Sequence, residues 1–266
     1  MSETTSFITT RDGSKIAYKL HGNPSAQQRV VLVHSLAMDH HYWTSVAKLL
    51  ISGAAVLTYD CRGHGQSDKP KGPYAIDLFA DDLADLMAHL GWSKAVIGGS
   101  SMGGSVTLAF AIRYPQLIAG LALIDTTSYY GDDAPTAWAG RAAAALEKGL
   151  GSLIEFQLTR WFSEKFKKTN AKIVQACVDT FLKNDVHAYA ETCKMLGNFD
   201  VRSGLSTIKV PTRIIVGEED YATPPAMAEV LHKNIARSKY DILPKARHLT
   251  PLECPERIAQ EIRALL

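Results

Sequence analysis

The 266-residue sequence has no apolar run that approaches the ~20 residues needed to span a bilayer. Its opening stretch, MSETTSFITTRDGSKIAY, is polar and lacks the apolar segment of a secretory leader. A charge excess of one sign is also missing, because 29 basic and 27 acidic residues leave a formal net charge of +2. We therefore expect a cytoplasmic protein that has neither a nucleic acid nor a membrane as partner.

Cysteine is scarce, and its spacing argues against a metal site. The chain has four cysteines and no CxxC pair, and no histidine cluster accompanies them: they are Cys61, Cys177, Cys193 and Cys254. We expect reduced thiols, with Cys61 as a small buried apolar residue rather than a reactive group. No metal and no cofactor are expected.

Short β-branched runs alternate with helical patterns along most of the chain. A hairpin is predicted at 7–8 and 15–20, followed by strands at 30–33, 55–59, 94–97, 120–124, 213–216 and 240–243. Helices are predicted at 74–90, 102–113, 225–233 and 255–266. This alternation predicts an α/β fold with a mostly parallel central sheet and helices on both faces.

Residues 128–198 interrupt the alternation. They contain little strand signal and four helical patterns, at 138–148, 151–162, 171–184 and 186–196. Ligand crevices of parallel sheets lie at the carboxyl ends of the strands, so we interpret this helical insertion as a cap over that crevice. The predicted organisation is a core of 1–127 and 199–266 with a cap of 128–198. A peripheral helical decoration is the alternative.

A glycine-rich turn supplies the candidate nucleophile. Gly99-x-Ser101-x-Gly103 follows an apolar strand and opens a helix at Met102, which is the context of a nucleophile elbow. Small flanking residues let the strand and helix approach closely, and the helix N-terminus directs N–H groups at developing negative charge. Ser100 competes for the role, but the glycine spacing favours Ser101.

A serine nucleophile needs a base, and the elbow pattern requires the chain order serine, acid, histidine. His248 follows the last predicted strand and precedes the terminal helix. A loop in that place lies at the crevice, so His248 is the candidate base. His187 and His232 fall within helical patterns and are expected at the surface.

The acid that orients the histidine should follow a strand between the serine and the histidine. Asp220 ends the turn after the strand at 213–216, and it is the preferred candidate. Asp125 also ends a strand and is the runner-up, with weaker candidates in Glu218 and Glu219.

The oxyanion produced by nucleophilic attack requires two N–H donors. One is expected from Met102, directly after the nucleophile. The other should come from the turn His34-Ser35-Leu36-Ala37 after the first parallel strand. Leu36 is preferred over Ser35 as that donor, and His34 is expected to pack the turn rather than to act as a base.

These motifs together resemble the α/β hydrolases over nearly the whole chain. The segment from Asp60 to Ser67 is similar to the D-x-R-G-H-G-x-S turn of that family, and it precedes the elbow, the acid and the histidine in the family's order. The resemblance implies the α/β-hydrolase fold. It also implies structural roles for Asp60 and Arg62.

A narrower resemblance is to 3-oxoadipate enol-lactonases. It is carried by Ser35-Leu36, by the stretch 159–162 (TRWF), by 189–193 (YAETC) before Phe199-Asp200, and by 220–225 (DYATPP). An enol-lactone acid carries a carboxylate, so the resemblance implies a basic group in the cap. Arg160 is the candidate, with Arg141 behind it, and a solvated helix-face arginine is the alternative. The other substrate-binding candidates are Ser35, Trp138 and Trp161, and for the two tryptophans packing within the cap is the alternative.

The function predicted from these residues is hydrolysis of a carboxylic ester or lactone through an acyl-enzyme, with a small molecule as substrate. The narrower resemblance implies an enol-lactone such as 3-oxoadipate enol-lactone, within aromatic catabolism. Ser101 argues against haloalkane dehalogenases and epoxide hydrolases, which carry aspartate at that position. Two alternatives stay open: a carbon–carbon bond hydrolase that acts on a ring-cleavage product, and a ligand receptor that retains the hydrolase fold. A homo-oligomer is compatible with the sequence.

Overall fold

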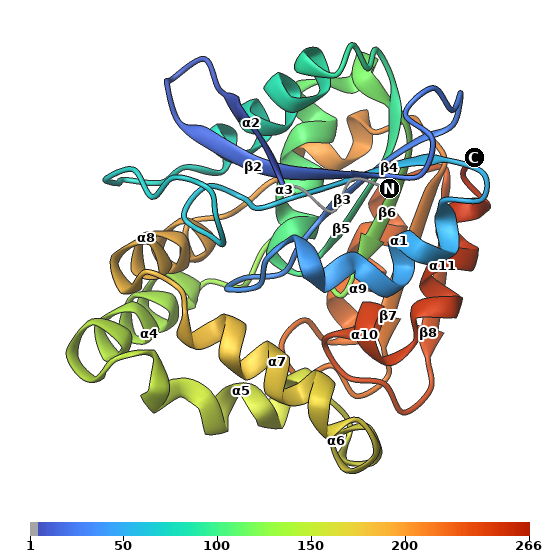
Figure 1. Cartoon of the computed structure of the whole chain (residues 1–266). Coiled ribbons are helices and arrows are strands. Elements are labelled where there is room, and N and C mark those ends of the chain that lie inside the picture. The colour runs from blue at the N-terminus through green and yellow to red at the C-terminus, as the bar shows by residue number, and fades with distance from the viewer. Residues whose placement is uncertain (1–4) are drawn as a thin grey trace.

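The computed structural model describes residues 5–266, and its centre is an eight-stranded sheet (Figure 1). The strand order is β1-β2-β4-β3-β5-β6-β7-β8. Strand β2 pairs antiparallel with β1 and β4, whereas the other neighbouring strands are parallel. The strand bounds are Ser6–Thr9 (β1), Lys15–His21 (β2), Arg29–Val33 (β3), Ala55–Tyr59 (β4), Ala95–Ser100 (β5), Ile118–Ile124 (β6), Thr212–Gly217 (β7) and Ser238–Leu243 (β8). The predicted mostly parallel sheet is confirmed.

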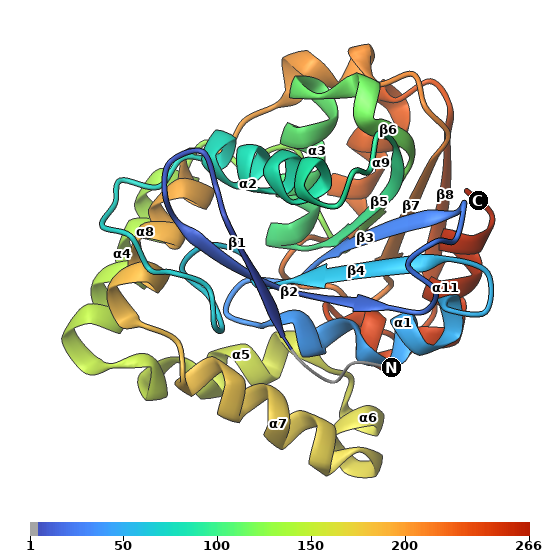
Figure 2. The ribbon, with the colours of Figure 1, turned by 45° about the horizontal axis from the view of Figure 1, so that its top comes forward.

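Helices cover both faces of the sheet, as predicted. In Figure 2, α2 (Ile76–His89), α3 (Met102–Arg113) and α9 (Pro225–Asn234) lie above it, and α1 (Thr44–Leu50) and α11 (Pro255–Arg263) lie below. The central strands β4 and β5 are buried along their full length, which explains their continuous apolar sequences. The sequence did not predict α1 or the single-turn helix α10 (Thr250–Glu253).

Five helices lie between β6 and β7, outside the layers that flank the sheet (Figure 1). They are α4 (Ala134–Lys148), α5 (Ile154–Trp161), α6 (Glu164–Thr169), α7 (Ala171–Leu182) and α8 (Val186–Gly197). We call them the inserted helices. The sequence predicted four: it missed α6, and the start of the pattern at 151–162 belongs to the 3₁₀ turn Leu150–Leu153.

The inserted helices leave and rejoin the sheet domain at one place. Tyr129 and Asp200 form an isolated antiparallel bridge, and the N–H of Val201 donates to the carbonyl of Ser128 at 3.0 Å. The two ends of the segment therefore lie side by side. Its division from the core as a separate cap unit stays a prediction. Across residues 5–266, the helices are all too short or too polar to cross a membrane.

Candidate active site

Ser101 stands on a strained turn between β5 and α3. Its φ of 56° and ψ of −119° are values that a residue with a side chain rarely adopts. The flanking glycines permit this turn. A Cβ on Gly99 would lie 2.1 Å from the carbonyl oxygen of Gly103, and a Cβ on Gly103 would lie 2.1 Å from that of Val33. The glycine spacing of the sequence thus has a steric cause, and it holds Ser101 at the carboxyl end of the sheet.

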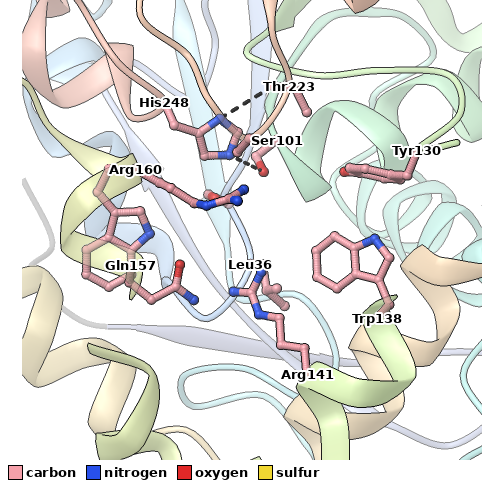
Figure 3. Close-up of a pocket in the computed structure, with 12 residues that line it drawn as sticks. Leu36, Ser101, Tyr130, Trp138, Arg141, Gln157, Arg160, Thr223 and His248 are labelled. Carbon is pink, nitrogen blue, oxygen red and sulfur yellow. Dashed lines mark hydrogen bonds between the residues drawn. The ribbon is translucent and has the colours of Figure 1, made fainter. Parts of the chain in front are cut away.

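A hydrogen-bonded chain connects Ser101, His248 and Asp220. His248 Nε2 lies 2.8 Å from Ser101 Oγ, and His248 Nδ1 lies 2.8 Å from Asp220 Oδ2. Figure 3 shows His248 directed at Ser101. When Nδ1–H donates to the carboxylate, Nε2 is left free to accept the serine proton. The structure therefore brings together the three residues that the sequence selected from distant parts of the chain.

Asp220 is held as a carboxylate by several donors. Its Oδ1 accepts from the N–H groups of Ala222 (2.8 Å) and Thr223 (2.9 Å), and its Oδ2 accepts from the Thr223 hydroxyl (2.9 Å). Burial alone would raise the pKa of Asp220, but His248 and these hydrogen bonds lower it below its ordinary value. Asp220 can therefore stabilise a positive charge on the His248 ring.

Asp125, the runner-up for the acid, is placed differently. Its Oδ1 accepts from the N–H of Gly217 at 3.1 Å, and its Oδ2 lies 3.1 Å from the N–H and 2.6 Å from the hydroxyl of Thr250. Burial and the charge of Asp220 raise the pKa of Asp125 well above its ordinary value. Asp125 ties the end of β7 to the start of α10, and its carboxyl oxygens are used there rather than at His248.

The remaining competitors also have other partners among the described residues. Ser100 Oγ lies 2.9 Å from Tyr42 Oη, Glu218 Oε2 accepts from the N–H of Lys245 at 2.9 Å, and Glu219 Oε2 lies 3.5 Å from Arg247 Nε. None of these contacts joins them to His248.

The two expected oxyanion donors flank the serine. Met102 is the first residue of α3, where N–H groups lack intrahelical acceptors. Leu36 follows β3 in a turn where Ala37 has a φ of 59°, and Leu36 lines the same cavity as Ser101. His34 fixes this turn: its Nδ1 lies 2.8 Å from the carbonyl of Ser35, and its Nε2 accepts from the N–H of Cys61 at 2.9 Å. His34 thus packs the turn, as the sequence predicted.

A cavity of about 60 Å³ opens beside Ser101. Its lining on the sheet side includes Ser35, Leu36, Ser101, Thr223 and His248. Its lining on the opposite side comes from α4 and α5: Trp138, Arg141, Gln157, Arg160 and Trp161. All four predicted substrate-binding residues, and Arg141 behind them, therefore reach one cavity. We call it the inner pocket (Figure 3).

A second, wider cavity of about 560 Å³ adjoins the inner pocket. The two cavities share Tyr130, Trp138, Arg141, Arg160 and Ala222. The wider one continues along α4 and α5 to Phe156 and Met227. The inner pocket is thus the enclosed end of a larger space, and the two arginines stand at the junction.

Both arginines lack a carboxylate partner within 4.0 Å among residues 5–266. Arg141 Nε donates to the Tyr189 hydroxyl at 2.6 Å, and Arg160 Nη1 donates to the carbonyl of Tyr221 at 3.2 Å. Burial, followed by the charge of Arg141, lowers the pKa of Arg160. Two guanidinium groups that have no carboxylate in contact favour an anion in this space.

The histidine loop and the inserted helices are joined through their backbones. The N–H of His248 donates to the carbonyl of Arg160 at 3.3 Å, and the N–H of Leu249 donates to that of Trp161 at 3.0 Å. Arg247 Nη1 donates to two more carbonyl oxygens near the end of α5. The position of the base is therefore tied to the helix that lines the pocket.

Sequence reasoning missed Gln157, Tyr130 and Thr223 as lining residues. For Gln157 a signal exists. It lies three and four residues before Arg160 and Trp161 on α5, a spacing that puts all three on one helix face. Tyr130 and Thr223 lie in irregular loops, where no periodicity indicates direction.

A family model described as the alpha/beta hydrolase fold matches residues 28–255. The chain belongs to this family.

Individual relatives narrow the comparison. The chain is 32% identical to 3-oxoadipate enol-lactonase 1 of Acinetobacter baylyi over 261 aligned residues. The alignment covers 98% of this chain and 96% of that protein. The crystal structure of the enol-lactonase from Burkholderia xenovorans LB400 matches with a TM-score of 0.93 and 31% identity, over 98% of this chain and 99% of that one. A thermophilic esterase from Thermogutta terrifontis matches with a TM-score of 0.91 and 30% identity, over 98% and 97%. These similarities support a hydrolase of esters or lactones in general terms.

Proposed function

We propose that this protein is a serine hydrolase that cleaves a carboxylic ester or lactone through an acyl-enzyme. The observation that carries the proposal is the chain of two 2.8 Å contacts from Ser101 through His248 to Asp220, in which Ser101 and His248 line a cavity. A buried serine, an imidazole and a carboxylate in this order form the arrangement that activates a hydroxyl for acyl transfer.

In this mechanism Ser101 Oγ attacks the carbonyl carbon while His248 Nε2 takes its proton. The N–H groups of Leu36 and Met102 stabilise the negative charge on the carbonyl oxygen. His248 then gives the proton to the leaving alkoxide oxygen, and the acyl group stays on Ser101. Water, deprotonated by His248, attacks the ester so formed. The bond between the carbonyl carbon and Ser101 Oγ breaks, His248 returns the proton to Oγ, and the acid is released. A lactone's leaving oxygen stays attached to the acyl group until this second step.

The preferred substrate in this proposal carries a carboxylate and is an enol-lactone such as 3-oxoadipate enol-lactone. Arg141 and Arg160 support it, because they supply positive charge at the inner pocket. The names of the enol-lactonase relatives support it as well. The Thermogutta terrifontis esterase structure has malate bound, and malate is a dicarboxylate. With this substrate the protein would act in aromatic catabolism in the cytoplasm, and that role stays a prediction.

Multiple-turnover hydrolysis of p-nitrophenyl acetate tests the reaction type. Ser101→Ala should lower kcat by at least ~10³-fold, because the variant lacks the attacking oxygen. Ser100→Ala is the matched control, since Ser100 contacts Tyr42 and not His248; it should keep turnover within about tenfold. Absence of turnover by the wild type, or equal activity of Ser101→Ala, would refute the proposal.

Hydrolysis of enol-lactone acids and of their methyl esters tests the substrate. The free acids should have the higher kcat/KM, and Arg160→Met should remove most of that preference by raising KM. An equal preference in wild type and Arg160→Met would refute the role of Arg160 while leaving the reaction type intact.

A further inference from the structure

Gln157 lines the inner pocket but has no role in the proposed reaction. It lies on α5 with 4% of its surface exposed. Figure 3 shows its amide directed into the pocket, on the side opposite Ser101 and His248. Among residues 5–266, its amide nitrogen and oxygen have no hydrogen-bond partner. A buried primary amide is therefore presented to the cavity.

An amide in this position takes its hydrogen-bond partner from the pocket. A buried amide that lacks every partner, water included, would cost roughly 1–3 kcal/mol. Gln175, on α7, shows the ordinary alternative: it is exposed, and its Nε2 donates to Asp179 at 2.8 Å. The partner of Gln157 therefore comes from the pocket, as water in the free protein and as a substrate group when a substrate is bound.

The neighbouring side chains of the inner pocket limit the chemical class of the substrate group that Gln157 binds. The other side chains that α4 and α5 contribute to the inner pocket are two arginines and two tryptophans, which are hydrogen-bond donors only. A glutamine amide both donates and accepts. A carboxylate is matched by the guanidinium groups, whereas an uncharged hydroxyl or keto oxygen is matched by the amide.

We propose that Gln157 is a specificity-determining residue that binds an uncharged oxygen, hydroxyl or keto, on the part of the substrate that enters the inner pocket. This inference rests on the proposed hydrolase function. Gln157 and Ser101 line the same pocket, so we expect this oxygen within a few bonds of the scissile carbonyl. The arginines at the junction are left to bind the carboxylate of the same substrate.

Three methyl esters of equal chain length test the proposal: methyl butyrate, methyl 3-hydroxybutyrate and methyl 3-oxobutyrate. Acid release by each is measured for the wild type and for Gln157→Met, which keeps the length of the side chain and removes both polar atoms. The wild type should prefer at least one oxygenated ester over methyl butyrate. Gln157→Met should reduce that kcat/KM ratio about tenfold, the equivalent of one hydrogen bond. Comparing ratios cancels the intrinsic reactivity of each ester.

The two oxygenated esters identify which part of the amide is used. Loss of the preference for the hydroxy ester alone assigns the amide oxygen as acceptor, because a keto group has no proton to donate. Loss of the preference for the keto ester assigns the amide nitrogen as donor. Gln175→Met is the matched control and should leave both ratios unchanged.

The outcomes that overturn the inference differ from those that overturn the hydrolase proposal. If Gln157→Met lowers all three esters by one factor, or changes none, Gln157 has only a packing role or binds water. If the wild type cleaves none of them and Ser101→Ala behaves identically towards p-nitrophenyl acetate, the hydrolase proposal fails. Inhibition by the product acids gives a second reading: 3-hydroxybutyrate should inhibit the wild type more strongly than butyrate, and Gln157→Met should lose the difference.

Discussion

Replacement of Asp220 by asparagine separates charge from shape at the candidate site. The amide oxygen can still accept from the N–H groups of Ala222 and Thr223, as the Oδ1 of Asp220 does. The amide nitrogen then takes the place of Oδ2, 2.8 Å from His248 Nδ1. Because that nitrogen is a donor, Nδ1 must become an acceptor and the ring proton must move to Nε2. Nε2–H then faces Ser101 Oγ and cannot take its proton.

The expected cost in kcat is about 10⁴-fold, which corresponds to roughly 5 kcal/mol of transition-state stabilisation. KM should change little, because Asp220 does not line the inner pocket. The unfolding temperature should also change little, since the backbone hydrogen bonds of the loop are kept. Initial rates with p-nitrophenyl acetate and thermal unfolding measure the two quantities.

Asp125→Asn is the matched control, because it makes the same change at the other buried aspartate of this region. Asp125 bonds to Gly217 and Thr250 rather than to His248, so this variant should lose stability and keep most of its kcat. If Asp125→Asn, still folded, loses as much kcat as Asp220→Asn, or if Asp220→Asn stays active, the assignment of the acid is wrong.

Two further predictions concern the framework of the site. Gly103→Ala should lower the free energy of unfolding in urea by at least about 2 kcal/mol, because the new Cβ would meet the Val33 carbonyl. Gly140→Ala, on α4 with open space around it, should raise that free energy by roughly 0.5–1 kcal/mol, and equal effects of the two would contradict the steric argument. Burial alone would raise the pKa of Asp60, but its hydrogen bond with His40 and other contacts lower it to about 2. Asp60 should therefore stabilise the fold above the unfolded-state pKa of roughly 4, and this stability should be lost as the pH falls towards 2. Unfolding midpoints measured between these pH values should show that loss, and Asp60→Asn should show a smaller one, because other aspartates with lowered pKa values, such as Asp220, still contribute.

The elbow and the strands were predictable because their signals are local. Ser101 is selected by two glycines, a preceding strand and a following helix, all within a few residues. Continuous apolar sequence indicates the buried strands. The strand β5 nevertheless runs on to Ser100, beyond the predicted end, because Gly98 and Gly99 carry no side chain that would mark a strand.

The sequence alone could not decide which of two aspartates orients the histidine, nor which residues line the pocket. Both depend on contacts between distant parts of the chain. Asp125 and Asp220 both end parallel strands, and the sequence alone does not show that Thr250 occupies the first of them. Gln157 is a polar residue on an amphipathic helix, and a glutamine exposed on the helix surface would give the same sequence pattern. The helix α6 has the sequence EKFKKT, which is too highly charged to show an apolar helical pattern. Its start is fixed by the Ser163 hydroxyl, which accepts from the N–H of Phe166.

The backbone contacts between α5 and the histidine loop limit how this chain can diversify. Arg160 and Trp161 offer their side chains to the pocket and their carbonyl groups to His248 and Leu249. Side chains on α5 can be exchanged by evolution or in a directed library without removing these hydrogen bonds, since the carbonyl groups are common to all residues. Transplanting a foreign helix of different length would instead shift the base itself. New specificity in this scaffold is therefore more accessible through point substitutions on α5 than through wholesale grafts.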